Sequence, residues 1–206
     1  MPEQLGGDHE ALRLAWDEVS KADLSVLAEA SGARADISTG ILSLRVMDRE
    51  CAIDIRARTM IWVTDPRPVK PHMQVLVLHY LLGSMRAGPS GTMVTFREFE
   101  GGAFYFDAYR KRTLDILVSV FGSDAELLKR AGERMGGVPS GRASAGFRVQ
   151  FFPRLAAEVL LWLGDDEVPA SSNLLYDSGA GRMLTTEGIT VLGGELVLRL
   201  VALSKA

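Results

Sequence analysis

Cysteine is nearly absent from this sequence of 206 residues, because Cys51 is the only one. One cysteine excludes an intrachain disulfide framework, and it also excludes an iron–sulfur cluster or a structural zinc site built from cysteine ligands. We therefore expect no iron–sulfur cluster, and the identity of any other cofactor stays unknown. Cys51 lies among alternating apolar residues, so we interpret it as a buried thiol rather than a nucleophile.

Long apolar runs and an excess of positive charge are also missing. No run approaches the ~20 apolar residues that span a bilayer, and the first ten residues, MPEQLGGDHE, are unlike a secretory signal. Lysine and arginine number 23 against 26 aspartate and glutamate, which gives a net charge of -3. A chain without a basic field is not steered to nucleic acid or anionic lipid. We expect a cytoplasmic protein that binds neither nucleic acid nor membranes.

The composition is otherwise that of a globular protein, with 47% hydrophobic and 24% charged residues. The length suits one full-sized domain with its own core and is short for two. We predict a flexible tail over residues 1–7 and a single domain over residues 8–206. Asp8 is expected to cap the first helix.

Two periodicities divide the first half of the chain. Asp23 and Gly32 have the positions of an N-cap and a C-cap around a short helix. Apolar residues then alternate with polar ones over residues 42–64, which predicts a β-hairpin and a third strand. The prolines at 66, 68 and 71 predict an irregular loop. Residues 72–85 are apolar on nearly every side, which is typical of a buried central helix.

The second half mixes helices and strands without strict alternation. A strand is expected over residues 93–99, helices near residues 105–121 and 125–135, and a glycine-rich loop over residues 136–146. Strands at 147–152, 155–163 and 173–176 follow, and Thr185 can cap a last helix. The pattern predicts an α+β fold, in which an antiparallel or mixed sheet packs against helices around the buried central helix.

The stretch from Leu160 to Asp177, LLWLGDDEVPASSNLLYD, reads as two short buried strands joined by an acidic loop. The carboxylates of Asp165, Asp166 and Glu167 could bind a hard cation such as calcium or magnesium. The spacing of an EF-hand is absent, however, and a solvated turn is the alternative.

Three segments of the sequence are distinctive: MVTFREFEGGAFYFDAYRKR with the following FG, the ERMGG segment, and LWLGDDEVPASSNLLYD with its trailing LTTEG. Together they resemble DUF3786, a bacterial and archaeal family defined by a domain of unknown function. Some members of that family carry a four-cysteine iron–sulfur module of the kind found in corrinoid iron–sulfur proteins. The resemblance thus implies anaerobic redox or one-carbon metabolism and a redox or corrinoid-related protein partner. This chain lacks those cysteines, and Val168 replaces an expected aromatic residue.

A second candidate site follows the strand expected near residue 95. Arg97 precedes the Gly101–Gly102 turn and could offer its guanidinium to a carboxylate or phosphate. The spacing matches no phosphate-binding fingerprint, and a packing turn with a surface ion pair is the alternative. Both candidate segments follow a strand and contain glycine. Because loops at the ends of strands in one sheet often meet at a shared edge, we expect the two segments to line one pocket. A structural ion pair between Arg97 and Asp165 or Asp166 is the alternative.

We therefore select candidate ligand-binding residues from both segments and assign no catalytic or metal-ligating residue. The candidates are Arg97, Glu98, Tyr105, Trp162, Asp165, Asp166, Glu167 and Asp177. Our first hypothesis is a binding module for a small molecule or cofactor. The alternatives are an enzyme that uses Glu98, Asp165 and Asp166 for acid–base chemistry, and a protein-interaction adaptor without a pocket.

Overall fold

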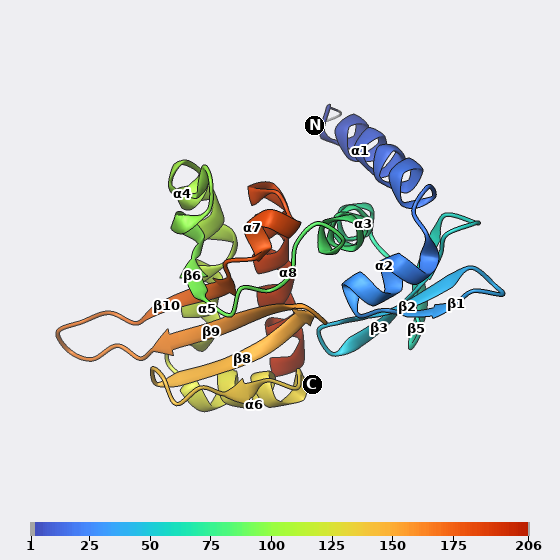
Figure 1. Ribbon diagram of the computed structural model, residues 1–206. Helices are drawn as coiled ribbons and strands as arrows, with labels where there is room; N and C mark the ends of the chain where they lie inside the picture. The colour runs from blue at the N-terminus through green and yellow to red at the C-terminus, as the bar shows by residue number, and fades with distance from the viewer. Residues whose placement is uncertain (1–2, 206) are drawn as a thin grey trace. The chain divides into compact units, whose positions relative to one another are not determined.

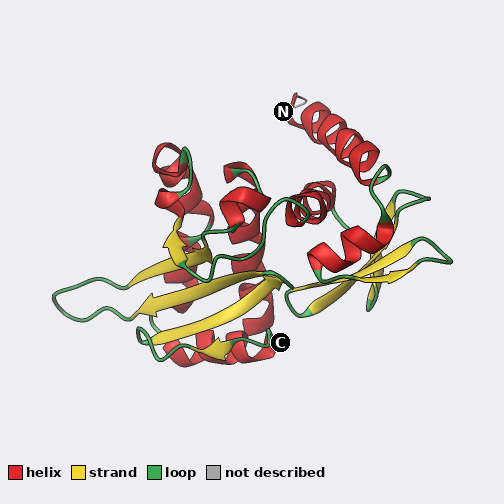
Figure 2. Cartoon of the chain, viewed as in Figure 1, coloured by secondary structure: helices red, strands yellow, loops and turns green. Residues whose placement is uncertain are grey.

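The computed structural model describes residues 3–205 and confirms an α+β chain. The chain divides into two compact units, each of which combines one sheet with helices (Figure 2). The first unit takes the chain up to Gly88, together with Phe152–Arg154 and Arg182–Leu184. The second takes Pro89–Phe151, Leu155–Gly181 and the chain from Thr185 onward.

The first unit joins three helices to a five-stranded antiparallel sheet in sequential order β1-β2-β3-β4-β5. Its elements are α1 (Glu3–Val19), α2 (Leu24–Ser31), β1 (Arg34–Asp36), β2 (Ile41–Val46), β3 (Arg49–Asp54), β4 (Thr59–Trp62), β5 (Asp65–Pro68) and α3 (Pro71–Ser84). The predicted caps of α2 are confirmed. Asp23 accepts hydrogen bonds from the N–H groups of Ser25 and Val26, and Gly32 is left-handed with φ of 75°.

Helix α3 is the buried helix that its apolar sequence predicts, and it packs against α1 and α2. Its Tyr80 is fully buried and stacks on Phe152 with ring centroids 4.1 Å apart. The Tyr80 hydroxyl donates to the carbonyl of Ser31 at 2.6 Å and accepts from the N–H of Arg154 at 3.1 Å. Phe152–Arg154 is thereby fixed to the first unit, although its neighbours along the chain belong to the second.

Two local predictions for the first unit are wrong. Helix α1 begins at Glu3, so Asp8 lies inside it rather than at its N-cap, and residues 1 and 2 of the expected tail lie outside the described residues. The proline segment forms strand β5 instead of an irregular loop. This strand is at the edge of the sheet and pairs only with β4, where a missing N–H is tolerated.

The second unit contains a five-stranded antiparallel sheet of order β6-β10-β9-β8-β7. Its strands are β6 (Met93–Thr95), β7 (Val138–Pro139), β8 (Ala145–Phe152), β9 (Leu155–Trp162) and β10 (Ser171–Asp177). Its helices are η1 (Phe96–Glu98, a 3-10 turn), α4 (Gly102–Arg112), α5 (Leu114–Phe121), α6 (Ala125–Arg134) and α8 (Thr186–Ser204), and α7 (Ala180–Met183) is shared between the units.

Helix α5 packs on β9 and β10, and α8 packs against α4, α5 and α6 (Figure 1). The predicted cap of α8 is confirmed, because Thr185 Oγ1 accepts from the N–H of Gly188 at 3.1 Å. The predicted apolar stripe of α8 is confirmed as well, since Ile189, Leu192, Leu196 and Leu200 are fully buried. The second unit therefore has its own core.

The strand expected over residues 93–99 ends at Thr95, because the chain turns there into η1. Glu98 Oε1 accepts from the N–H of Thr95 at 2.7 Å and from its hydroxyl at 2.9 Å. In a capping box, the glutamate at the third helical position accepts a hydrogen bond from the backbone N–H of the N-cap residue, as Glu98 does here. The sequence T-x-x-E indicates this motif. Helix α4 then begins at Gly102, where a Cβ would lie 2.1 Å from the carbonyl oxygen of Phe96.

Candidate functional site

The first predicted segment uses its polar groups locally. The guanidinium of Arg97 lies over the ring of Phe106, 3.8 Å from the centroid, and Glu98 holds the turn at Thr95. Tyr105 is 55% exposed and contacts Phe104 edge to face. The segment therefore presents aromatic rings and one stacked guanidinium to solvent.

The acidic loop, residues 163–170, also uses a polar side chain for hydrogen bonds within the loop. Asp165 Oδ1 accepts from the N–H groups of Glu167 at 2.9 Å and Val168 at 2.8 Å. These two hydrogen bonds lower the pKa of Asp165 below its usual value. Asp166 and Glu167 are exposed, and Trp162 is 41% exposed at the end of β9. Figure 1 shows the β9–β10 connection extending beyond the ends of its strands.

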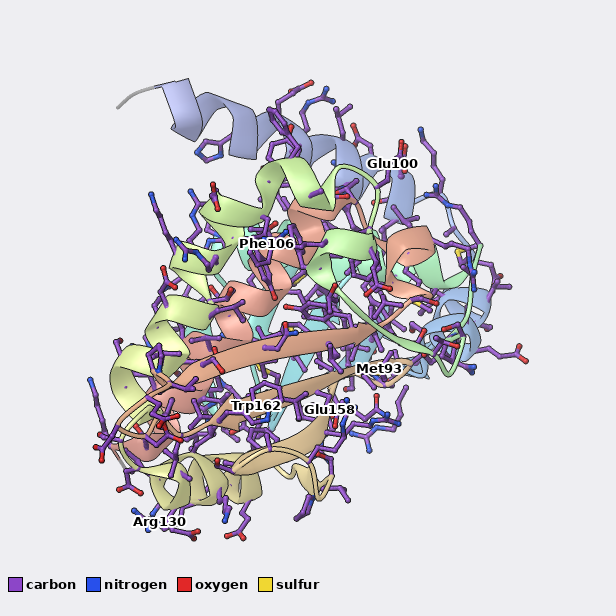
Figure 3. All side chains as sticks on the ribbon, turned by 90° about the vertical axis from the view of Figure 1, so that its left-hand side faces the viewer. Met93, Glu100, Phe106, Arg130, Glu158 and Trp162 are labelled. Carbon is purple, nitrogen blue, oxygen red and sulfur yellow. The ribbon has the colours of Figure 1, made fainter. Side chains whose placement is uncertain are left out.

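The strand register determines how the two segments relate to each other. Strands β6 and β9 both pair with β10 and run in the same direction, so each segment follows a strand of one sheet. Thr95 is opposite Leu175, whereas Trp162 is opposite Ser171, an offset of about 14 Å along β10 at ~3.4 Å per residue. Figure 3 also shows Phe106, the residue on whose ring the guanidinium of Arg97 stacks, well apart from Trp162. A ligand site shared by the two segments stays a prediction.

Asp177, the last predicted residue, is buried and organises the turn before β6. Its carboxylate accepts from the N–H groups of Ser90, Gly91 and Gly179, each at 2.7 Å, and from the Ser90 hydroxyl at 3.0 Å. Burial raises the pKa of Asp177, but the hydrogen bonds from Ser90, Gly179 and Gly91 together outweigh it and hold the pKa below its usual value. Its acceptor sites are thus occupied by its own unit.

The structure places another group of polar residues around a hollow of the second unit. We call it the Glu158 hollow; its volume is about 520 Å³. The glycine-rich segment (residues 136–146), β8 and β9 supply its walls. Its lining residues are Gly136, Val138, Pro139, Ser140, Arg142, Arg148, Val149, Gln150 and Glu158.

Glu158 is the buried charge of this hollow. It lies in the middle of β9 and is only 2% exposed. Its Oε2 accepts from Nη1 of Arg142 at 3.2 Å, and the Arg142 side chain remains 58% exposed. The pair joins the glycine-rich segment to the sheet and keeps a carboxylate at the wall of the hollow.

Arg148 and Gln150 provide the free polar groups. They alternate with buried residues along β8 and therefore share one face of the strand. Within the described part of the chain, neither side chain makes a hydrogen bond or an ion pair. The hydroxyl oxygen of Ser140, which also lines the hollow, is buried and has no partner among the described residues. Arg148 and Gln150 are exposed to solvent, whereas an unsatisfied buried atom such as the Ser140 hydroxyl oxygen is rare in folded proteins and needs an explanation.

The glycine-rich segment is fixed where it meets the sheet. The ring of Phe147 fills the space where a Cβ of Gly132 or Gly137 would lie, at 2.6 and 2.7 Å. The N–H of Ser140 donates to the carbonyl of Gly146 at 3.0 Å. Arg142 also lines a second, smaller hollow of about 220 Å³, together with Lys129 and Glu133 of α6; we call it the Lys129 hollow.

Among known families, the model of DUF3786, a domain of unknown function, matches residues 23–199. The chain belongs to DUF3786. It matches no curated protein and no solved structure. The matched range includes the Glu158 hollow and both segments that the sequence predicts as a site.

The sequence of this DUF3786 chain contains weak signals for the Glu158 hollow. Glu158 is a single acid in the otherwise apolar strand LAAEVLLW, and a buried charge of this kind needs a partner. Arg148 and Gln150 alternate with apolar residues in AGFRVQFF. No spacing indicates that Arg142, sixteen residues before Glu158, is its partner, because only the fold brings the two together.

Within residues 3–205, no helix is long and apolar enough to cross a membrane. Among the side chains that the structure describes, no three of His, Cys, Asp or Glu are grouped so that they could hold a metal ion. The polar groups that line the Glu158 hollow are two guanidinium groups, an amide, a hydroxyl and a carboxylate.

Proposed function

We propose that this DUF3786 chain is a small-molecule-binding module whose ligand occupies the Glu158 hollow and carries an anionic group. The observation that carries the proposal is the convergence of unpartnered polar groups, Arg148, Gln150 and the Ser140 hydroxyl, on one hollow. A volume of about 520 Å³ lies within the range of ~300–1,000 Å³ common for ligand pockets.

The charges of the hollow favour an anion. Arg142 and Glu158 offset each other as a pair, which leaves the positive charge of Arg148 in excess. A guanidinium binds a carboxylate or phosphate through two parallel hydrogen bonds, which a lysine cannot reproduce. The amide of Gln150 offers both a donor and an acceptor for an adjacent polar group of the ligand.

We propose further that the module works beside redox or one-carbon enzymes. Membership of DUF3786 supports this link only through the resemblance to members with an iron–sulfur module. One cysteine leaves this chain without the ligands of such a cluster, so the ligand we propose is a small organic or phosphorylated molecule.

The proposal is tested by native mass spectrometry of the full chain purified from its own source. The wild-type protein should retain a small molecule that Arg148→Ala loses. Arg130→Ala is the matched control, because Arg130 is an exposed arginine of α6 outside the hollow (Figure 3). Equal retention by wild type and both variants would place the ligand elsewhere and contradict the proposal.

A further inference from the structure

We infer that the ligand of the Glu158 hollow belongs to the class of amino carboxylates, molecules with both a carboxylate and a cationic amine. This inference rests on the proposed function and specifies its ligand. The carboxylate would bind Arg148 and Gln150, and the ammonium would bind Glu158 in place of the guanidinium of Arg142.

Glu158 is buried at the wall of the hollow. Removing a carboxylate from water costs several kcal/mol, and an ion pair repays this only when its geometry is excellent. The described contact is a single N–O approach of 3.2 Å rather than a bidentate pair. An apolar residue of similar volume is often neutral or stabilising at such a position. A charge at the wall of a hollow is therefore better explained by a bound cation than by stability.

The side chain of Arg142 is not confined to its contact with Glu158. Its side chain is 58% exposed, and it extends from the glycine-rich segment rather than from a strand or helix. It lines the Lys129 hollow as well, where Glu133 of α6 offers a second carboxylate. Arg142 can thus leave Glu158 for Glu133 when an ammonium arrives, and no charge is left unpaired by the exchange.

Opposite charges from two strands line the same hollow. Arg148 and Gln150 come from β8, and Glu158 comes from β9. A ligand that spans both strands meets a cation at one end and an anion at the other. A plain carboxylate uses only the first of these, whereas an amino carboxylate uses both.

The test is a calorimetric titration of the full chain with ω-amino acids of two to six carbons and with the plain carboxylates of the same length. A charge-assisted hydrogen bond to Glu158 should make the best amino acid bind about tenfold more tightly than its matched carboxylate. The length series is needed because the amine must span the distance from Arg148 to Glu158.

Two variants separate recognition by Glu158 from a merely structural ion pair. Glu158→Gln should abolish the preference for the amino acid over the plain carboxylate of the same length. Arg142→Gln keeps a hydrogen-bond donor for Glu158 but removes the competing cation, so the preference should increase. Thermal unfolding of both variants shows that they are folded during the titrations.

The outcomes are distinguishable. Equal affinities for amino acid and carboxylate, in wild type and in Arg142→Gln, would overturn the amino carboxylate class and leave the proposed anion site standing. Loss of the preference in both variants would show that the pair only holds the loop, which also overturns the inference. Absence of saturable binding for every probe, with no molecule retained in native mass spectrometry, would overturn the proposed function itself.

Discussion

Two carboxylates of the second unit, Asp177 and Glu158, are both buried, but their surroundings satisfy them differently. Asp177 accepts hydrogen bonds from three backbone N–H groups of neighbouring turns. Glu158 has a single described partner, and that partner belongs to an exposed side chain of a glycine-rich segment. The first arrangement fixes a turn, while the second leaves Glu158 with one hydrogen bond at the wall of the hollow.

At Asp177 the hydrogen bonds should make stability depend on pH. The folded-state pKa is lowered, so its contribution is present above the unfolded-state value of about 3.9 and is lost as the pH falls through the folded-state pKa. Asp177→Asn should lower the free energy of unfolding by about 1–3 kcal/mol at pH 7. Urea unfolding from pH 7 to pH 3 measures this difference, which should shrink below about pH 4.

The exposed Asp166 of the acidic loop is the control for this prediction. Asp166→Asn should leave the free energy of unfolding within about 0.5 kcal/mol of wild type, as is usual for surface substitutions. A difference for Asp177→Asn that is equally small at pH 7 would contradict the structural role of Asp177.

At the scale of elements, local residues predict helix ends at Asp23, Gly32 and Thr185 but not at Asp8, and they predict tertiary contacts poorly. Asp23 and Thr185 cap their helices as their side chains predict, because a cap depends only on N–H groups two or three residues away. The sequence did not predict the proline strand β5, because the position of this strand at the edge of a sheet depends on tertiary structure. The same holds for the hollow, since Arg142 and Glu158 meet only after β8 and β9 have formed.

Two adjacent glycines of α8 give a prediction at this scale. A Cβ on Gly193 would lie 2.4 Å from the hydroxyl oxygen of Tyr176, whereas a Cβ on Gly194 would meet nothing within 4 Å. Tyr176 is fully buried, and its hydroxyl is 2.9 Å from that of Tyr109, so it has little room to move. Gly193→Ala should therefore destabilise the protein by about 1–3 kcal/mol.

Gly194→Ala is the matched substitution and should stabilise the protein by about 0.5–1 kcal/mol through helix propensity alone. Chemical denaturation of the two variants measures both effects. Equal effects of the same sign would contradict the close packing of α8 on the tyrosine pair.

At the scale of the whole molecule, the chain passes between its two units several times. Phe152–Arg154 and Arg182–Leu184 belong to the first unit, although both are flanked by segments of the second. The length and composition predict one domain, and these exchanges of chain favour cooperative unfolding of the two units. A single domain stays a prediction, because each unit also has its own buried core.

Substitutions in the two cores test whether the units unfold together. Leu78 in the first unit and Leu161 in the second are fully buried, so replacing either by alanine should cost about 2–5 kcal/mol. Both variants should shift one common transition in calorimetry, while Leu14→Ala on the exposed side of α1 should have little effect. Two transitions, of which each variant shifts only one, would contradict a single cooperative domain.

The most direct test of the Glu158 hollow as the ligand site is a nuclear magnetic resonance titration of the ¹⁵N-labelled chain. The probes are a plain carboxylate such as butyrate and its ω-amino acid, 4-aminobutyrate. We predict saturable shifts of the Arg148 Nε–H and Gln150 side-chain amide signals, together with backbone signals of residues 136–150. Saturable shifts at Arg97, Tyr105 and Trp162, with none in the hollow, would contradict the proposed site and support the one predicted from the sequence.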